Sequence, residues 1–452
     1  MSKVWFITGS SRGFGREFAL AALKRGDQVA ATARDTKTLT DLVERFGDAV
    51  LPLRLDVTDR AQVFEAVAAA KERFGRLDVV VNNAGYSLIG AVEELGEQEL
   101  RDQLETNVFG VVHVTQAVLP VLRAQGSGHI VQISSAMGVA TFAGAGGYSA
   151  SKWALEALSE ALSQEVAAFG IKVTLIEPGG FATDFASSSV FTAHRQDAYG
   201  PLHASLNEMS ATARDTAMLT DLVDRFGDAV LPLRVDVTER TQVFEAVAAT
   251  KERFGRLDVV VNNAGYALVG AVEELSEQEL RDELETNLFG VLHVTQAVLP
   301  VLREQGSGRI FQISSVAGLT AMAGMGGDHA SKWALEGLSE ALAQEVARFG
   351  IDVTIVEPGG FDTNFKNAAV YTAHAKDAYE QLHASLREQG ATAQMPGPDG
   401  VGAAILELVD AEQPPLRVLF GEHPTQWVPA AYEQRLRTWA EWAHVSKIAE
   451  GT

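Results

Sequence analysis

The sequence predicts a doubly wound α/β fold, present as one nearly complete copy and one truncated copy. Short apolar runs of strand length alternate with segments of helical spacing, which predicts a parallel sheet covered by helices on both faces. Most of the chain also occurs twice, because the string ATARDT at residues 31–36 returns at residues 211–216. The alternation sets the fold class, and the repeat sets the number of copies.

The first elements are a strand, a glycine-rich turn and a helix. Residues 3–8 are rich in residues that favour strands and are followed by glycines. Residues 16–24 have apolar residues at helical spacing, and residues 28–33 predict a second strand. The later strands are predicted at 50–56, 77–82, 130–134 and 173–177, and the later helices at 63–74, 97–125 and 148–169.

The two copies lie between unique ends of the chain. Residues 1–30 form a head and residues 391–452 a tail, and these enclose copy one (31–210) and copy two (211–390). Head, one copy and tail together make 272 residues, an ordinary length for a one-domain enzyme. We infer that the middle of such an enzyme was duplicated in tandem.

The duplication leaves two units that are incomplete in opposite ways. Residues 1–209 lack only the tail, whereas residues 210–452 lack the head. In the second unit, we expect three strands of copy two to form a smaller sheet with a strand at 416–420, which follows a helix at 401–409. In a rival arrangement the head joins copy two. The chain between the head and copy one is shorter, so bringing these two parts together costs less closure entropy, which favours copy one as the partner of the head.

Composition excludes several classes of function. The formal net charge of -22 disfavours nucleic acid and anionic membranes, which would repel the protein. The chain has no cysteine, so disulfides, thiolate nucleophiles and zinc-thiolate sites are excluded. We recognise no secretion signal and no apolar run long enough to span a bilayer. We therefore expect a cytoplasmic protein without nucleic-acid or membrane partners.

The turn TGSSRGFG lies between the first strand and the first helix. Its small residues Thr8, Gly9, Gly13 and Gly15 would let the backbone approach a pyrophosphate at the helix N-terminus. A glycine-rich turn alone is also compatible with simple turn chemistry. Its place between strand and helix favours dinucleotide binding.

Charges near the end of the second strand bear on the choice of dinucleotide. The position of a ribose-binding acid holds Ala33, and Arg34 follows, while Arg12 lies in the glycine turn. Two guanidinium groups suit a 2′-phosphate, so we favour NADP(H) over NAD(H), although Asp35 weakens this preference. Asp56 is either a ligand of the adenine edge or a turn former.

An ordered set of motifs resembles the short-chain dehydrogenase/reductase family. The motifs are TGSSRGFG, Asp56, NNAG at residues 82–85, Asn107, Ser135, Tyr148 with Lys152, and Pro178-Gly179 with Thr183. The resemblance implies a Rossmann-like parallel sheet in the order 3-2-1-4-5-6-7, with the nicotinamide near strands four to six. It implies these cofactor-binding residues: Gly9, Ser11, Arg12, Gly13, Phe14, Gly15, Arg34, Asp56, Val57, Asn83, Ala84, Gly85, Lys152, Pro178, Gly179 and Thr183.

Tyr148 and Lys152 form the expected chemical centre. A carbonyl reduced by hydride needs a proton at its oxygen, and a phenol with a pKa of about 10 is a poor relay at neutral pH. Lys152 follows four residues later on the same helix face, so we expect its charge to lower the pKa of Tyr148. By resemblance, Lys152 also holds the nicotinamide ribose.

Two further residues complete the expected catalytic set. Ser135, at a strand end, would hydrogen-bond the substrate oxygen, whereas strand alternation turns Ser134 to the other face. Asn107 resembles the family residue that fixes a water in the proton path. The alternative for Asn107 is a surface or helix-kink residue.

Copy two departs from this pattern at the position of the tyrosine. The counterparts Asn287, Ser315 and Lys332 are retained. Asp328 replaces the tyrosine, and once ionised it cannot protonate an alkoxide, since an unperturbed aspartate has a pKa of about 3.9. His329 is adjacent, but one step along a helix turns a side chain about 100° away. Because a glycine turn is also missing before residue 211, we expect copy two to be inactive.

These features predict an NADP(H)-dependent oxidoreductase in which copy one acts on a small-molecule ketone or secondary alcohol. The loop at 181–199, with Phe185, Phe191 and Tyr199, suggests a lipophilic substrate, although such aromatic clusters are as often ordinary packing. The rival class is a non-catalytic nucleotide-binding or assembly protein, which the truncations and the lost tyrosine of copy two favour.

The repeated helices and the tail bear on assembly. The near-identical helices at 97–125 and 277–305, and at 148–169 and 328–349, predict a two-fold pseudo-dimer within one chain, with a homo-oligomer as the alternative. The tail carries three tryptophans that we expect to cover the exposed core of copy two: Trp427, Trp439 and Trp442.

Overall fold

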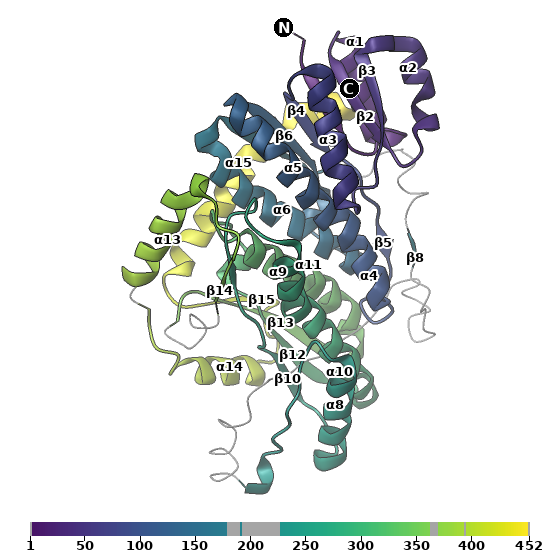
Figure 1. Cartoon of the computed structure of the whole chain (residues 1–452). Coiled ribbons are helices and arrows are strands. Elements are labelled where there is room, and N and C mark those ends of the chain that lie inside the picture. The colour runs from purple at the N-terminus through teal and green to yellow at the C-terminus, as the bar shows by residue number, and fades with distance from the viewer. Residues whose placement is uncertain (1, 179–189, 192–226, 362–368, 393–394, 451–452) are drawn as a thin grey trace.

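The computed structural model contains two parallel sheets flanked by helices, one sheet for each copy (Figure 1). It describes residues 2–178, 190–191, 227–361, 369–392 and 395–450. The first strand of the head pairs with strands of copy one: Trp5 lies opposite Val29 on one side and Val79 on the other. The rival arrangement, in which the head joins copy two, is therefore wrong.

The sheet of the head and copy one has the order β3-β2-β1-β4-β6-β7, and its strands are parallel. Its strands are β1 (Val4–Ile7), β2 (Gln28–Ala33), β3 (Val50–Arg54), β4 (Val79–Asn82), β6 (Gly128–Ile133) and β7 (Ile171–Ile176). This is the predicted order without the seventh strand. The carboxyl ends of β1 and β4, where the order reverses, therefore form the crevice in which this type of sheet binds ligands.

The helices of this unit flank the sheet on both faces. They are α1 (Gly13–Lys24), α2 (Thr40–Phe46), α3 (Arg60–Phe74), α4 (Glu97–Leu104), α5 (Gly110–Gln125) and α6 (Gly146–Val166). A short strand β5 (Leu88–Ile89) pairs with β8 (Val190–Phe191). The helix predicted over 97–125 is interrupted, because a π-helical turn at Glu105–Phe109 separates α4 from α5. Such turns are often found at functional sites.

Copy two and the tail form the smaller sheet that the sequence predicts. Its order is β10-β12-β13-β15, with β10 (Val259–Asn262), β12 (Gly308–Ile313), β13 (Ile351–Pro358) and β15 (Arg417–Phe420). Its other elements are α8 (Arg240–Phe254), β11 (Leu268–Val269), α9 (Glu277–Leu284), α10 (Val291–Gln305), α11 (Gly326–Val346), β14 (Val370–Tyr371), α13 (Glu380–Thr392), α14 (Val401–Asp410) and α15 (Pro424–Glu450). The tail helix α14 packs on Phe311, Val356 and Phe420 of this sheet.

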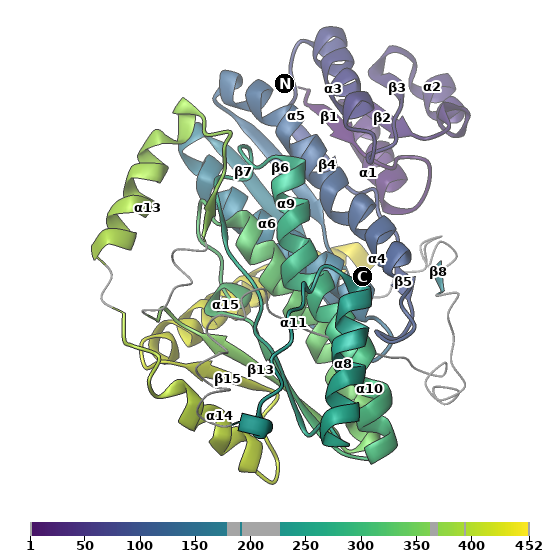
Figure 2. The same cartoon turned by 60° about the horizontal axis from the view of Figure 1, so that its bottom comes forward.

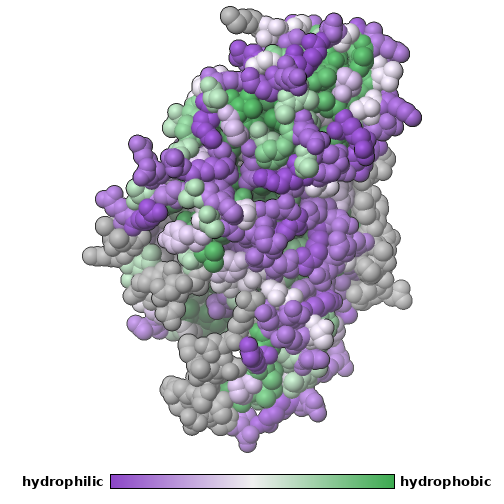
Figure 3. Space-filling model, viewed as in Figure 1, coloured by the Kyte–Doolittle hydropathy of each residue, from purple (hydrophilic) through white to green (hydrophobic). Residues whose placement is uncertain are grey.

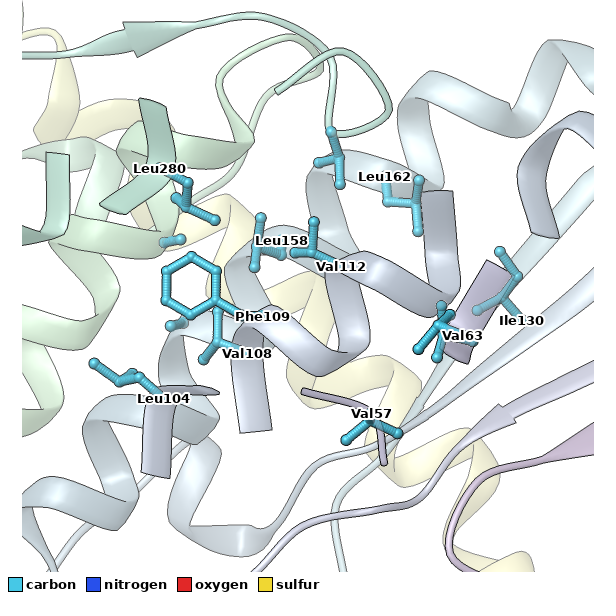
Figure 4. Close-up of a cluster of buried hydrophobic side chains, with 14 of the residues drawn as sticks. Val57, Val63, Leu104, Val108, Phe109, Val112, Ile130, Leu158, Leu162 and Leu280 are labelled. Carbon is cyan, nitrogen blue, oxygen red and sulfur yellow. The ribbon is translucent and has the colours of Figure 1, made fainter. Parts of the chain in front are cut away.

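One hydrophobic core runs through both copies. Leu280 of α9 lies beside Phe109 of copy one, close to Val112 and Leu158, and all four belong to the same buried cluster (Figure 4). The helices of the two copies pack side by side (Figure 2). On the face that Figure 3 shows, the described surface around the middle of the molecule is mainly hydrophilic, as expected if the apolar helix faces point inward.

One expectation about the long helix is corrected. Among the described residues, the segment Glu97–Gln125 is long and apolar enough to cross a membrane, and 78% of its most apolar window is buried inside the protein. The statement that no run reaches that length is therefore wrong. The apolar side chains of this segment instead form part of the core shared by the two copies.

Reciprocal polar contacts join the two copies. Arg101 pairs with Glu285, and Arg281 pairs with Glu105, so that each copy makes the same ion pair with the other. Each arginine also lies over a phenylalanine of the opposite copy, at 4.1 and 4.2 Å from the ring centroids. This is the self-complementary pattern of a two-fold interface. The two copies of one chain therefore pair as the predicted pseudo-dimer.

The tail helix α15 leaves copy two and runs behind copy one (Figure 1). Arg435 pairs with Glu160 of α6, and Trp439 donates a hydrogen bond to Glu177 at the end of β7. Trp442 is 61% exposed. Trp439 and Trp442 therefore do not cover copy two as predicted, because α15 turns towards the unit that lacks its own tail.

Candidate active site in copy one

The glycine turn is tight because three of its positions accept no larger residue. Gly9 and Gly13 have positive φ angles of 68° and 56°, which favour glycine. A Cβ atom on Gly15 would collide with the carbonyl oxygen of Gly9. These glycines therefore leave the backbone at the start of α1 without side chains, as the sequence predicted.

Thr8 and Asn83 tie this turn to the end of β4. The hydroxyl oxygen of Thr8 accepts hydrogen bonds from the backbone N–H groups of Asn83 (2.8 Å) and Ala84 (3.0 Å). The side-chain amide of Asn83 donates to the carbonyl oxygens of Thr8 (2.9 Å) and Gly9 (3.2 Å). The glycine turn and the NNAG motif are thus one structural unit, and Thr8 links them.

The residues expected around the adenosine half lie at the same sheet edge. Arg12 and Arg34 are exposed, as the preference for a 2′-phosphate requires. The carboxylate of Asp35 accepts the backbone N–H of Lys37 at 3.0 Å. The carboxylate of Asp56 accepts the backbone N–H and the hydroxyl of Thr58, so this residue has the geometry of a turn former.

Of the remaining expected cofactor residues, some lie within the part of the chain that the structure describes and others do not. Ser11 and Phe14 are half-buried in the glycine turn. The buried Val57 accepts a hydrogen bond through its carbonyl from His113, and the carbonyl of Pro178 accepts the N–H of Ala136. Outside the described residues lie Gly179, Thr183, the side chains of the loop at 181–199, and the expected boundary between residues 209 and 210.

Three of the four expected catalytic residues meet at the carboxyl end of β6. Tyr148 and Lys152 are both buried on α6, and the ammonium nitrogen of Lys152 lies 5.9 Å from the ring centroid of Tyr148. Ser135 hydrogen-bonds the Tyr148 hydroxyl. Ser134 faces the other way, against Glu156. The alternation argument therefore separated the two serines correctly.

The pKa of Tyr148 differs from the expectation. Burial raises it to about 12, although the hydrogen bond from Ser135 acts in the opposite direction. The Lys152 ammonium donates to the carbonyl oxygen of Ile133 at 2.8 Å, and burial lowers its own pKa to about 8. In the protein alone, desolvation of the phenolate is the largest influence on this pKa and raises it, so the predicted lowering is wrong here.

The fourth residue, Asn107, holds the site from the π-helical turn. Its side chain is buried and bonds both backbone groups of Tyr86, through Nδ2 at 2.9 Å and Oδ1 at 3.1 Å. Nδ2 also donates to the hydroxyl of Ser151 at 3.0 Å, which in turn donates to the carbonyl of Tyr148 at 2.7 Å. Ser151 was missed, and its position three residues after Tyr148 on one helix was the available signal.

Gly85 completes the contact between the turn and the catalytic residues. A Cβ atom at this position would lie 3.0 Å from the amide oxygen of Asn107 and 3.7 Å from the Lys152 nitrogen. The NNAG motif therefore packs its backbone directly against both side chains. Cofactor candidates and catalytic candidates occupy one continuous region at the carboxyl edge of the sheet.

Copy two has the same framework with different chemistry. Asp328 is buried next to Lys332 and Glu283. Burial raises the pKa of Asp328, and burial together with Asp328 raises that of Glu283 well above its usual range. The argument from an unperturbed aspartate therefore does not apply, because desolvation favours the neutral acid. The described part of copy two nevertheless contains no strands equivalent to β1 and β2.

His329 has a structural role, as expected from its direction on the helix. Its Nδ1 lies 2.8 Å from the carbonyl oxygen of Ala317, and its Nε2 accepts the N–H of Met322 at 2.9 Å. Both ring nitrogens are therefore occupied, and burial lowers the pKa of the ring. A neutral, fully bonded imidazole cannot replace the missing tyrosine.

Comparison with known families agrees with this geometry. The sequence model of the short chain dehydrogenase family matches twice, over residues 3–194 and 199–390. The chain belongs to the short-chain dehydrogenase family. The double match also agrees with a tandem duplication of one family domain.

Curated relatives of the family match one domain of this chain. Oxidoreductase BOA17 of Botryotinia fuckeliana is 53% identical over 191 residues, which are 42% of this chain and 70% of that protein. The 3-ketodihydrosphingosine reductase of Bacteroides thetaiotaomicron is 42% identical over 186 residues, covering 41% of this chain and 66% of that protein. Retinol dehydrogenase 7 of Mus musculus is 37% identical over 187 residues, covering 41% and 58%.

Solved structures of the family match as well. The structure of ElxO with NADP bound is 32% identical, with a TM-score of 0.40, and the match covers 41% of this chain and 76% of that one. The 3-ketoacyl-(acyl-carrier-protein) reductase from Brucella melitensis, complexed with NADH, is 29% identical, with a TM-score of 0.40 and coverage of 41% and 79%.

Proposed function

We propose that residues 1–209 form an NADP(H)-dependent oxidoreductase that interconverts a ketone and a secondary alcohol, and that residues 210–452 are its inactive partner. One observation carries the proposal: in copy one, Tyr148 is bonded to Ser135 and lies beside Lys152, which is close to Gly85 of the NNAG motif. Copy two has Asp328 in place of that tyrosine.

The residues of copy one fit a nicotinamide dinucleotide. The backbone is closely packed at the N-terminus of α1, since a Cβ atom on Gly9 or Gly15 would collide with the side chain of Asn83 or with backbone atoms. Backbone N–H groups there would hold the pyrophosphate, and Lys152 with the NNAG backbone would hold the nicotinamide ribose. When bound, the dinucleotide supplies or accepts the hydride.

The arginines of copy one favour NADP(H) in this proposal. Arg34 is exposed at the end of β2 and Arg12 is exposed in the glycine turn, and an adenosine 2′-phosphate would lie at this edge of the sheet. The carboxylate of Asp35 is turned to the N–H of Lys37, which reduces its conflict with that phosphate. A guanidinium can bind a phosphate through two parallel hydrogen bonds.

Tyr148 would carry the proton. During reduction, its hydroxyl gives a proton to the substrate oxygen, and the resulting phenolate is stabilised by the Lys152 ammonium. The Ser135 hydroxyl bonds the same oxygen as negative charge develops on it. Asn107, fixed by Tyr86 and Ser151, would hold a water that returns the proton. During oxidation, the same groups act in reverse.

We propose a lipophilic ketone or secondary alcohol as the substrate class. The aromatic residues of the loop at 181–199 support this choice, as do two relatives that are named for 3-ketodihydrosphingosine and retinol. The absence of cysteine supports a reducing compartment, and the cytoplasm is our proposed location.

A matched pair of variants tests this function. Turnover of NADPH is measured with a panel of long-chain ketones, and of NADP with the alcohols, for Tyr148→Phe and Asp328→Asn. We expect Tyr148→Phe to lower kcat by roughly 10² to 10⁴ and to keep NADPH binding, since general acid catalysis contributes about that much. Asp328→Asn should leave kcat unchanged. NADPH binding without turnover in the unmodified protein would instead favour a non-catalytic nucleotide-binding protein.

A further inference from the structure

The segment that leads into α6 determines where Tyr148 lies. Gly144 precedes Tyr148 by one helical turn and has a φ of 95°, a conformation that other residues rarely adopt. Its carbonyl oxygen accepts the N–H of Gly90 at 3.1 Å. Further upstream, the hydroxyl of Thr141 lies 2.6 Å from that of Ser149, the residue after Tyr148. The path of this segment therefore fixes the start of the catalytic helix.

Copy two holds this segment from the opposite side. The backbone N–H of Gly144 donates to Oε1 of Glu345 at 3.3 Å, and the side-chain amide of Gln344 donates to the carbonyl oxygen of Thr141. Glu345 is 1% exposed, and its carboxyl group lies near the backbone of Val92. A Cβ on Gly146 would lie 3.2 Å from Ala341, so α11 touches the first turn of α6 directly.

Copy one makes the same contacts with copy two. Glu165 accepts the N–H groups of Gly324 (3.2 Å) and Val272 (2.9 Å), and the Gln164 amide donates to the carbonyl of Ala321. Both glutamates are buried and accept the N–H of the equivalent glycine, but Oε2 of Glu165 accepts a second N–H, whereas Oε2 of Glu345 has no partner among the described residues. They differ in what they support, because Gly144 precedes a tyrosine and Gly324 precedes Asp328.

We propose that Glu345, which belongs to the inactive copy, is a positioning residue for Tyr148 of the active copy. This inference rests on the proposed function of copy one. Without an acceptor for its N–H, Gly144 loses a bond that holds its unusual conformation, and the segment before α6 can shift. A misplacement of about 1 Å at a reacting group can cost roughly 100-fold in rate. Copy two would then be retained because it completes the active site of copy one.

The symmetry of the pseudo-dimer provides the control for this proposal. Kinetic constants, NADPH affinity and melting temperature are measured for Glu345→Ala, Glu345→Gln and Glu165→Ala in the full chain. We expect Glu345→Ala to lower kcat roughly 10- to 100-fold while the Kd for NADPH changes less than about two-fold. Glu345→Gln, which keeps an acceptor oxygen, should restore most of kcat. Glu165→Ala should lower the melting temperature to a similar degree but leave kcat near that of the unmodified protein.

Equal losses of kcat in Glu345→Ala and Glu165→Ala would overturn the proposal, because they would reflect general destabilisation. Gln344→Ala covers the case in which Glu345→Ala fails to fold. Its side chain is exposed, and we expect a smaller loss of kcat in the same direction. An unchanged kcat in Gln344→Ala together with no rescue by Glu345→Gln would equally contradict the proposal.

Hydrogen exchange separates this proposal from the proposed function. In Glu345→Ala, the amide of Gly144 should lose protection whether or not a substrate has been found, and Glu165→Ala should affect Gly324 instead. If these shifts occur but Tyr148→Phe does not alter turnover, the contact is real and the proposed function is wrong. Unchanged protection of Gly144 would refute the positioning role by itself.

Discussion

The sequence VVVN occurs in both copies, as β4 and as β10, and the two strands differ in burial. In copy one, Val79 and Val81 are 4% and 2% exposed, whereas in copy two Val259 and Val261 are 37% and 44% exposed. The difference comes from the head, whose strand β1 pairs with β4 and has no counterpart beside β10 in the described residues. The repeated sequence alone therefore does not build a nucleotide-binding sheet.

A second difference lies at the catalytic helix. In copy one, the side-chain amide of Gln103 donates to the carbonyl of Tyr86, near Tyr148. In copy two, Glu283 accepts the N–H of Leu268, and the charge of the buried Asp328 contributes to raising the pKa of Glu283. Two buried acids have thus replaced an amide and a phenol. In the proposed function copy two is inactive, so such changes there need only be compatible with packing.

The tail contributes one arginine to the carboxylates of each copy. Arg417 of β15 bonds Glu336 and Glu340 in copy two and lies over the ring of Trp153 in copy one. Arg435 of α15 bonds Glu160, the equivalent of Glu340, and lies over Trp333, the equivalent of Trp153. Helix α15 thus supplies copy one with part of what β15 supplies to copy two.

Loss of Arg417 should have the largest effect on stability. Arg417→Met leaves the buried carboxyl groups of Glu336 and Glu357 without their cation, and breaking a buried pair costs about 3–5 kcal/mol. Calorimetry should show a lower melting transition. Arg437→Met, at an exposed pair with Glu433, is the control and should change little. Equal effects of both variants would show that the arginine cluster of copy two is not structural.

The stability of the interface should depend on pH. Burial raises the pKa of Glu165 to about 7, from the usual 4.5, so its neutral form favours the folded state. This contribution to the stability of the folded protein is fully present below the pKa that Glu165 has in the unfolded chain. It is lost as the pH rises through the pKa that Glu165 has in the folded protein. We expect a loss on the order of 2 kcal/mol between about pH 5 and pH 8. Glu165→Gln should flatten the corresponding fall in melting temperature, and an unchanged slope would refute the assignment.

The two interface arginines should contribute equally. Arg101→Ala and Arg281→Ala each remove one ion pair across the interface, one ion pair within the same helix and one contact with a phenylalanine ring, in equivalent, half-exposed surroundings. We expect each to cost about 1 kcal/mol, measured by denaturant unfolding. A large difference between them would show that the pseudo-two-fold symmetry does not extend to the energetics.

Restoring the tyrosine of copy two should have the smallest effect. Asp328→Tyr should leave turnover per chain within about two-fold of the unmodified protein, because copy two has no glycine turn ahead of it. The measurement is kcat at saturating NADPH and substrate. A doubling of active sites, seen as a second cofactor-dependent phase, would show that copy two was silenced only by this substitution.

Much of the architecture could be predicted because it depends on local patterns and on the repeat. The strand order, the missing seventh strand and the four-stranded sheet follow from apolar periodicity and from which copy owns the head or the tail. The expected residues Ser135, Tyr148 and Lys152 also meet as predicted, since motif spacing and strand alternation determine their directions.

What could not be predicted depends on burial and on contacts across the interface. The raised pKa of Tyr148 requires knowing how deeply α6 is buried. The partners of Arg435 and Trp439 lie in copy one, far away in the sequence. The sequence gives only a weak signal for the role of Glu345. The signal is an acid on an otherwise apolar helix face, and the equivalent acid is present in the other copy. Comparing Gln103 with Glu283 would have revealed the second acid beside Asp328.

The central claim is that one chain contains one cofactor site, built by the head and copy one. The direct test is the stoichiometry of NADPH binding, measured by fluorescence titration of the full chain and of Gly15→Ala, whose added Cβ collides with the Gly9 carbonyl. We predict one site per chain, lost in Gly15→Ala. Two sites per chain, or one site that survives in Gly15→Ala, would contradict the account.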